Sequence, residues 1–355
     1  MVSTNNNSGD IMKTCNNPEA RPNQQRALFS RLAGAAGVVL VMTATSFQTF
    51  ASEAGAAESY PSKPISMIVS YPPGGSVDAA GRILQDPLSK TLGQAVVIEN
   101  KGGAGGTIAT RYVSSAKADG YTMLLTLSSH TINPAIYTNL AFDTEKDLAA
   151  VSLVASAPQV LVANPKFPAK SIKELIKYVK DSGEDVSYGS AGIGSPSHIA
   201  GELFRLKTGL KLVHIAYRGG GPATVDVLGG QIPLLWVSLP SVTQYIASGK
   251  LNALAVSTAK RTPILPDVPS IAETIDGFNV DSWYGMFAPA GTPPAIVKKM
   301  QEAVAKAAQD KRIQEAFNAI GAVVVGSPPE EMDAIVKREI VMWKALAKEA
   351  NIKVN

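Results

Sequence analysis

Short apolar runs alternate with amphipathic segments along most of this 355-residue chain. Apolar runs of strand length cover residues 65–70, 95–99, 121–127, 186–188, 212–217, 232–239 and 251–256. Between them, apolar residues recur every three or four positions, which is typical of helices packed on a core. Such segments start near Ser76, Pro222 and Ser241, and three more follow over 294–309, over 312–320 and from Pro328 onward. This alternation of strand and helix predicts an α/β fold with largely parallel sheets.

Residues that cap helices refine these predictions. Ser195 can cap a helix whose first residue is Pro196, and Gly209 suits the end of that helix. Pro87 lies inside the helical pattern that starts near Ser76, so a kink or a break is expected there. Two capping boxes, in which a glutamate follows a serine by three positions, predict further helix starts: Ser171 with Glu174, and Ser327 with Glu330.

Residues 1–56 have the pattern of an export signal. Arg26 and Arg31 precede an apolar run over 32–42, and small residues follow, so cleavage is expected between Ala51 and Ala56. The run is short for a membrane span, and an uncleaved anchor is the alternative. Cys15, the single cysteine, lies before the run, so cleavage leaves a protein without thiol chemistry. The leader predicts export to the periplasm.

Composition fits a folded protein and argues against nucleic-acid binding. Hydrophobic residues make up 45% and charged residues 17% of the chain, which allows a substantial core. The length suggests two domains or a single large one. The formal net charge is +4, and the lysines and arginines are scattered along the chain. A nucleic-acid-binding surface would need them gathered in a patch.

Two segments combine a strand, a glycine-rich loop and a helix start. The first covers residues 71–78, and the second covers residues 188–198, where serines are dense. Glycines let the backbone approach a ligand with its N–H groups turned inward, and a helix N-terminus adds a partial positive charge. We interpret the pair as one anion-binding cradle from each of two lobes. Ordinary connections between a strand and a helix are the alternative.

The sequence lacks the usual motifs of enzymes and of nucleotide or metal sites. Neither glycine loop continues into a dinucleotide or P-loop motif, and no Gly-x-Ser-x-Gly elbow occurs. The histidines His130, His198 and His214 share no metal-ligand spacing. His214 is predicted to pack in the core, whereas His130 and His198 face either a ligand or the interior. We expect no catalysis, no cofactor and no metal.

A few other side chains have two possible roles. Asp78 either caps its own helix or accepts a hydrogen bond from a ligand. Arg218 is the basic residue nearest a glycine loop, and it meets either a ligand or a surface acid. Trp283 and Tyr284 could line a cleft, whereas Trp236 is predicted to pack in the core.

Seven pieces of the chain, in a fixed order, resemble a known family. They are Tyr71-Pro-Pro-Gly-Gly-Ser-Val-Asp78, Glu99-Asn-Lys-Gly-Gly-Ala-Gly-Gly-Thr107, Asn133-Pro134, Tyr188-Gly-Ser-Ala-Gly-Ile-Gly-Ser-Pro-Ser-His198, Tyr217-Arg-Gly-Gly-Gly-Pro222, Leu228-Gly-Gly-Gln231 and Ser282-Trp-Tyr-Gly-Met-Phe-Ala-Pro-Ala-Gly-Thr-Pro-Pro294. From residue 60 or so to its end, the chain resembles the tripartite tricarboxylate transporter receptor family. These solute-binding proteins of the periplasm are also called the Bordetella uptake gene (Bug) family.

The resemblance implies a type II periplasmic binding protein fold, with a ligand cleft between two α/β lobes. Lobe 1 is expected to cover 57–157 and 283–355, and lobe 2 to cover 158–282, with crossings near 156–159 and 281–285. The two glycine loops are expected to hold a ligand carboxylate. Where relatives usually carry acids after Gly229-Gly230-Gln231, this chain has Pro233 and Val237. The far wall of the cleft is therefore expected to be apolar and to favour aromatic or aliphatic acids.

The ligand-binding residues expected from the loops and the resemblance lie in four stretches of the chain. They are Pro73, Gly74, Gly75, Ser76, Asp78, Ser128, Ser129, His130, Ser190, Ala191, Gly192, Gly194, Ser195, Ser197, His198, Tyr217, Arg218 and Gly219.

The function implied is the capture of a small carboxylate, either a dicarboxylate or tricarboxylate or an aromatic acid. A monomer would deliver this acid in transient contact with a permease of two integral-membrane subunits. Nucleic acid is not an expected partner. A ligand-presenting co-receptor for a sensory system is the alternative, because both roles use the same closed, liganded surface.

Overall fold

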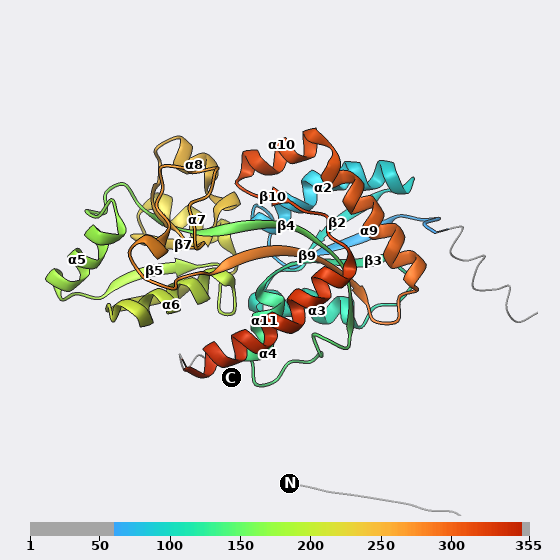
Figure 1. Cartoon of the computed structure of the whole chain (residues 1–355), viewed down its shortest axis with the longest axis horizontal. Helices are drawn as coiled ribbons and strands as arrows, with labels where there is room; N and C mark the ends of the chain where they lie inside the picture. Colours follow the sequence, from blue (N-terminus) through green and yellow to red (C-terminus); the bar gives the residue numbers. More distant parts are fainter. Residues whose placement is uncertain (1–59, 350–355) are drawn as a thin grey trace, which may run out of the picture. The chain divides into compact units, whose positions relative to one another are not determined.

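The structure of the protein is a computed structural model, and it describes residues 60–349. The predicted export signal over 1–56 lies outside these residues. Within them, ten strands form one mixed sheet (Figure 1). The strands are β1 (Ile65–Val69), β2 (Val96–Asn100), β3 (Thr122–Leu127), β4 (Leu148–Ala163), β5 (Val186–Ser190), β6 (Leu212–Ala216), β7 (Leu234–Ser238), β8 (Asn252–Val256), β9 (Asp281–Pro289) and β10 (Val323–Val324).

The strands follow the order β2-β1-β3-β9-β4-β7-β5-β6, while β8 and β10 pair with β4 outside this path. β1 is parallel to β2 and β3, and β5 is parallel to β6 and β7. β9 is antiparallel to β3 and β4, and β4 is antiparallel to β7, β8 and β10. The prediction of largely parallel sheets is therefore wrong for the middle of the sheet, where the unpredicted strands β4 and β9 lie.

The long strands β4 and β9 connect two groups of strands and run side by side (Figure 1). β4 pairs with β9 through Pro158, and from Gln159 onward it pairs with β7. Proline has no N–H to donate, so it suits the point where a strand changes partners. We call β1, β2, β3, β9, β10 and β4 up to Pro158 the first strand group, and β5 to β8 with the rest of β4 the second strand group.

Helices and short 3-10 segments connect the strands. The α-helices are α2 (Ser76–Leu92), α3 (Thr107–Ser114), α4 (Ser129–Ile136), α5 (Ile172–Ser182), α6 (Pro196–Thr208), α7 (Gly220–Gly229), α8 (Thr243–Ala247), α9 (Pro294–Gln309), α10 (Lys311–Ile320) and α11 (Pro329–Glu349). The 3-10 segments are η1 (Ala104–Gly106), η2 (Leu239–Ser241) and η3 (Ile271–Glu273). Among the residues described, no helix combines the length and the apolar character needed to cross a bilayer.

The predicted helix ends are partly correct. Ser195 caps α6, with Pro196 as its first residue and Gly209 in the left-handed conformation at its end. Of the kink or break predicted at Pro87, the break is wrong, because α2 continues through that residue to Leu92. The helix α4 was not predicted from the sequence.

The capping boxes differ from the prediction. The Ser171 side chain accepts from the Glu174 N–H as expected, but the Glu174 carboxylate accepts from the Lys170 N–H instead of the Ser171 N–H. The predicted box at Ser327 is absent from the described contacts. The Ser327 hydroxyl instead accepts a 3.0 Å bond from the N–H of Leu153 in β4.

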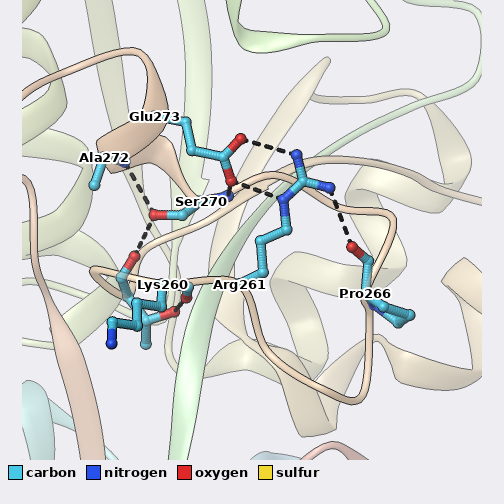
Figure 2. A network of polar contacts seen from close by, with 7 residues as sticks. Lys260, Arg261, Pro266, Ser270, Ala272 and Glu273 are labelled. Atoms are coloured by element: carbon cyan, nitrogen blue, oxygen red, sulfur yellow. Dashed lines mark hydrogen bonds and ion pairs between the residues drawn. The ribbon is translucent and has the colours of Figure 1, made fainter.

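An unpredicted capping box opens η3. Figure 2 shows Ser270 accepting a 3.1 Å bond from the Ala272 N–H, while the Glu273 carboxylate accepts from the Ser270 N–H at 2.9 Å. The Arg261 guanidinium makes two bonds to the same carboxylate, 2.7 and 2.8 Å long, and a third to the Pro266 carbonyl. Several polar bonds therefore hold the connection from β8 to β9.

The last helix packs against both strand groups. Met332, Val336 and Ile340 of α11 lie in an apolar cluster with residues of β1, β3, β4 and β9. Trp343 and Ala347, nearer its end, lie in a second cluster with residues of α5, α6 and β7. α11 therefore links the two cores in addition to β4 and β9.

Candidate functional site

Three helices begin at one small cavity, which we call the central cavity. α2 begins there at Ser76, α6 at Pro196 and α7 at Gly220. Its walls come from both strand groups and consist of Tyr71, Gly75, Ser76, Leu127, Gln159, Ala191, Pro196, Ser197, Gly220, Val237, Ser238 and Ser241. The cavity volume is about 10 Å³, near the smallest size that holds one water molecule.

The charge at this cavity comes from the backbone. Each helix start presents N–H groups without partners in the helix and carries a partial positive charge. No lysine or arginine is among the lining residues. The cavity therefore favours a small anionic group that can accept several hydrogen bonds.

The first glycine loop is held in place by Asp78. This carboxylate is 4% exposed and accepts bonds of 3.0 Å from the Gly74 N–H, the Arg82 Nε and the Asn100 Nδ2. Burial alone would raise the pKa of Asp78, but the hydrogen bonds from Arg82, Gly74 and Asn100 lower it overall. Asp78 does not line the central cavity, so the geometry favours a role in fixing the loop.

The second glycine loop uses much of its own hydrogen-bonding capacity. The Gly192 N–H donates to Ser190 Oγ at 3.1 Å, and the Ala191 N–H donates to Ser197 Oγ at 3.0 Å. The Gly194 N–H donates to Nδ1 of His198 at 3.4 Å. These three N–H groups are therefore engaged inside the loop. At the start of α6, Pro196 has no N–H and the His198 N–H donates to Ser195 Oγ at 3.2 Å, so among the first three residues of that helix only Ser197 keeps an N–H for an anion.

Two histidines lie behind this loop. The rings of His198 and His214 lie tilted to each other with their centroids 4.5 Å apart, and His214 Nε2 lies 2.6 Å from Ser190 Oγ. Burial and the neighbouring His214 lower the pKa of His198 to about 4. Burial also lowers the pKa of His214, which is half-buried and hydrogen-bonded and so is not the fully packed core residue that was predicted. Both rings support the loop in their neutral forms.

A second cavity adjoins the central one, and we call it the tyrosine cavity. It has a volume of about 190 Å³ and is lined by Tyr71, Gly103, Ala104, Gly105, Tyr137, Ala191, Gly192, Ile193, Ala216, Tyr217 and Arg218. Tyr71 and Ala191 line both cavities. Tyr71 is 3% exposed, and its hydroxyl is buried beside the hydroxyl of Ser129.

The structure divides the predicted ligand-binding residues into three sets. Gly75, Ser76, Ala191 and Ser197 line the central cavity, and Ala191, Gly192, Tyr217 and Arg218 line the tyrosine cavity. The others line neither cavity and lie in the supporting loops or the interior: Pro73, Gly74, Asp78, Ser128, Ser129, His130, Ser190, Gly194, Ser195, His198 and Gly219.

The Ser128–His130 stretch forms the start of α4, directly after β3, inside the protein. His130 is 1% exposed, and its ring lies 4.3 Å from that of Phe287, centroid to centroid. Neither ring nitrogen has a hydrogen-bond partner among the described residues, and burial lowers the pKa of His130 to about 3. Of its two predicted environments, the structure shows the interior one.

Several cavity residues were not predicted. At the central cavity they are Tyr71, Leu127, Gln159, Pro196, Gly220, Ser238 and Ser241. Gln159 sits where β4 changes partners, and its Nε2 donates to Ser238 Oγ at 2.8 Å. The glycine run before Pro222 was a usable signal for Gly220, because it also precedes a helix. Gln159 had no local signal, since its place depends on the pairing of β4.

The expected apolar wall is present in part. Val237 lines the central cavity, whereas Pro233 lines neither cavity and accepts a backbone bond from Asn164. Trp236 is buried in the core as predicted, and Trp283 donates from Nε1 to the Glu339 carboxylate. In the part of the chain that the structure describes, no group of three or more histidine, cysteine or acidic side chains could hold a metal.

Comparison with known proteins identifies the family. A family model described as "Tripartite tricarboxylate transporter family receptor" matches residues 80–352. Protein BugT of Bordetella pertussis (strain Tohama I) is 38% identical over 300 residues, which is 84% of this chain and 92% of BugT.

Solved structures agree in fold over most of the chain. The periplasmic binding protein BugD matches with a TM-score of 0.80 and 38% identity, over 83% of this chain and 99% of BugD. The R. palustris protein Rpa4515, solved with adipate, matches with a TM-score of 0.80 and 32% identity, over 83% of this chain and 99% of that protein. The predicted α/β fold of periplasmic binding proteins is confirmed, and the chain belongs to the tripartite tricarboxylate transporter receptor family.

Proposed function

We propose that this protein binds a small organic acid by its carboxylate in the central cavity. The observation that carries the proposal is the meeting of three helix N-termini, those of α2, α6 and α7, at one cavity without lysine or arginine. A carboxylate accepts hydrogen bonds from several N–H groups at once, and each bond to a charged acceptor is stronger than a neutral one. Ser76, Ser197, Ser238 and Ser241 add hydroxyl donors to the same walls.

The bound state of a relative supports an acid as the ligand. Rpa4515, a protein of the same fold at 32% identity, was solved with adipate. Adipate is a dicarboxylate, so it carries the group that the central cavity favours. The ligand of the present chain is proposed to belong to the same broad class of small carboxylates.

The central cavity lies between two lobes, and each lobe contributes part of its walls. We assign 57–157 and 283–355 to lobe 1 and 158–282 to lobe 2. With these bounds, the point where β4 changes its pairing from β9 to β7 lies at the boundary between the two lobes. A volume of about 10 Å³ is too small for an acid with a carbon chain, so the lobes separate to admit one and close around it. The protein is exported to the periplasm, where it hands its ligand to a permease of two membrane subunits and performs no catalysis.

A thermal-shift experiment tests the acid. A ligand that binds only the folded state at 100 times its Kd adds about 2.7 kcal/mol to the free energy of unfolding. For a chain of this size that gain raises the Tm by about 5 °C. Dicarboxylates, tricarboxylates and aromatic acids are compared with their neutral amides. At least one acid is expected to raise the Tm while its amide does not.

The proposal would be overturned if a sugar, cation or nucleotide raises the Tm while every acid leaves it unchanged. Gly75→Val is the comparison variant, because Gly75 lines the central cavity and an added Cβ there meets only the Pro72 carbonyl oxygen. An acid that still stabilises this variant as strongly as the native protein binds somewhere else.

A further inference from the structure

His214 lies behind the second glycine loop and lines neither cavity. It is the third residue of β6 and lies opposite Tyr188 in the neighbouring strand. Its Nε2 lies 2.6 Å from Oγ of Ser190, which is the last residue of β5 and is fully buried. The His214 ring also stacks on that of Tyr188, with the centroids 5.1 Å apart. Two residues of β5 therefore hold this ring in place.

The Ser190 hydroxyl has one proton to donate, and its contacts indicate where this proton goes. The Gly192 N–H donates to Ser190 Oγ at 3.1 Å, so this contact uses a lone pair of the oxygen. His214 Nε2 is the other hydrogen-bonding partner of Ser190 Oγ among residues 60–349. Since a buried hydroxyl needs an acceptor, the Ser190 proton goes to Nε2. The His214 ring is then neutral, with its own proton on Nδ1.

Gly192 connects this pair of side chains to the start of α6. Its N–H is held by Ser190, and its carbonyl oxygen accepts a 2.6 Å bond from the hydroxyl of Ser195, the residue that caps α6. Gly192 itself lines the tyrosine cavity, while Ser197 in the first turn of α6 lines the central cavity. A change in the hydrogen bonds of Ser190 therefore acts on both cavities through one residue.

The charged and titratable groups that face the His214 ring come from α6 and β5. The ring of His198 lies 4.5 Å away, and the Glu202 carboxylate accepts bonds from the Tyr188 hydroxyl and from Arg205. Burial lowers the pKa of His214, and the charge of Glu202 partly opposes this effect. His214 is half-buried, whereas His198 is only 6% exposed. His214 is therefore the first of the two rings to take up a proton as the pH falls.

We propose that His214 is a positioning residue for acid binding, because its neutral ring accepts the Ser190 proton and leaves Ser190 Oγ to hold Gly192. A protonated ring carries a proton on Nε2, so it donates to Ser190 instead of accepting. The Ser190 hydroxyl then loses the acceptor that the structure gives it, and its oxygen is shared between two donors. The loop loosens, and the protein releases its acid as the pH falls. The inference rests on the proposed function and adds its regulation by protons.

The test replaces the ring in two matched ways on the mature form of the chain. His214→Gln keeps an amide oxygen that can accept the Ser190 proton but does not titrate, whereas His214→Phe keeps a ring that cannot accept. His130→Leu is the control, because His130 is a buried histidine that lines neither cavity. Succinate, adipate, citrate and benzoate are titrated calorimetrically into each protein at pH 7 and at pH 5.

At pH 7 we expect His214→Phe to bind an acid about 10-fold or more weakly than the native protein, and His214→Gln to bind it within about threefold. The neutral ring is the form that binds, so affinity is full above pH 6.5, the ordinary pKa of histidine, and falls as the pH passes through the lowered pKa of His214. From pH 7 to pH 5 the native protein and His130→Leu should therefore lose more affinity than His214→Gln does. Thermal transitions without ligand check that each variant is folded.

The direction of the hydrogen bond is tested without any acid, so this part of the test does not depend on the folding of His214→Phe. The nitrogen NMR signals of the His214 ring at pH 7 should show a proton on Nδ1 and none on Nε2. In Ser190→Ala the pKa of His214 should rise, because the hydroxyl no longer stabilises the neutral ring.

Three results would overturn the role of His214. One is a proton on Nε2 of the neutral ring, and another is equal acid affinity in His214→Phe and the native protein. The third is the same pH dependence of binding in His214→Gln as in the native protein. If none of the four acids binds the native protein, the proposed function fails and its regulation with it, whereas the NMR signals still decide how Ser190 and His214 are bonded.

Discussion

At the scale of single residues, the glycines around the central cavity are needed for different reasons. Gly75 has a φ of −84°, and an added Cβ would lie 3.4 Å from the Pro72 carbonyl oxygen, which is ordinary contact. Gly192 has a φ of 117°, and its Cβ would lie 2.7 Å from the Tyr217 carbonyl oxygen. A side chain therefore fits at Gly75 without strain, whereas glycine at position 192 is required by the backbone.

Gly75→Val and Gly192→Ala should therefore separate binding from stability. Gly75→Val is expected to abolish acid binding and to change the free energy of unfolding by less than about 1 kcal/mol. Gly192→Ala should cost about 1–3 kcal/mol of stability, because alanine is strained at this φ and meets a carbonyl. Urea denaturation and calorimetric titration of both variants measure the two effects. Normal binding by Gly75→Val would remove that loop from the site.

Asp78→Asn tests the role of the buried acid. The carboxylate accepts three hydrogen bonds, from Gly74, Arg82 and Asn100, and an amide cannot accept all of them. We expect a loss of about 1–3 kcal/mol in the free energy of unfolding. The loss should shrink as the pH falls below 3.8, toward the lowered pKa of the folded state, since protonated Asp78 also loses these acceptors. Unchanged stability together with lost binding would instead make Asp78 a ligand contact.

The residue types were enough to locate the glycine loops in the sequence. They did not predict which hydrogen bonds these loops make. The loops were recognisable because glycines between a strand and a helix have a clear pattern. Whether the Gly194 N–H meets a ligand or His198 depends on a ring position that only the packing of α6 against β6 decides. For the same reason the inner position of His130 did not follow from its place after a strand.

At the scale of helices and strands, the short segments bounded by capping or turn residues could be predicted, whereas the two long strands β4 and β9 could not. α9 was predicted with its observed bounds, and α6 with its first residue and its cap. β4 runs for 16 residues, nearly all buried, with Pro158 inside it. No turn residues divide that apolar run into recognisable strands, and proline argues against a central strand. Its pairing is decided by contacts with β9 and β7, far away in the sequence.

The two-sided packing of α11 can be tested at Trp343. This side chain is 6% exposed and lies in the apolar cluster of the second strand group, while Met332 and Val336 of the same helix pack against the first. Trp343→Ala should reduce the free energy of unfolding by about 3–5 kcal/mol. Val341→Ala is the matched control, because Val341 is 71% exposed on the same helix, and it should change stability little. Similar losses in urea denaturation for both variants would contradict the role of α11 as a link.

At the scale of the whole molecule, buried neutral histidines make stability depend on pH. The pKa of His130 is lowered to about 3 and that of His198 to about 4, both first of all by burial, from an ordinary value of 6.5. Above pH 6.5 both are neutral whether folded or unfolded, so the full stability is present. Below it the unfolded chain binds protons that the folded state does not, and stability falls until the folded pKa values are reached.

His130→Leu isolates this effect. Each histidine should lower the free energy of unfolding by about 2 kcal/mol as the pH falls from 6.5 to 5. Buried acids such as Glu339, whose pKa burial raises, act in the opposite direction, so the variant is compared with the native chain at each pH. At pH 7 His130→Leu should be as stable as the native protein or more so, since no bond to its ring is lost. If His130→Leu binds an acid more weakly than the native protein does at pH 7, His130 contributes to the binding site after all.

The small volume of the central cavity also has a consequence for the rate of capture. The cavity has room for little more than one water, about 10 Å³, so the proposed binding of an acid there requires its walls to move apart. In stopped-flow mixing, the observed rate should therefore rise with acid concentration and then level off at the rate of opening. A linear rise up to the highest concentrations would mean that the acid enters without such a motion. When acid is plentiful, the protein's own movement, and not the frequency of encounters, would limit how fast it fills.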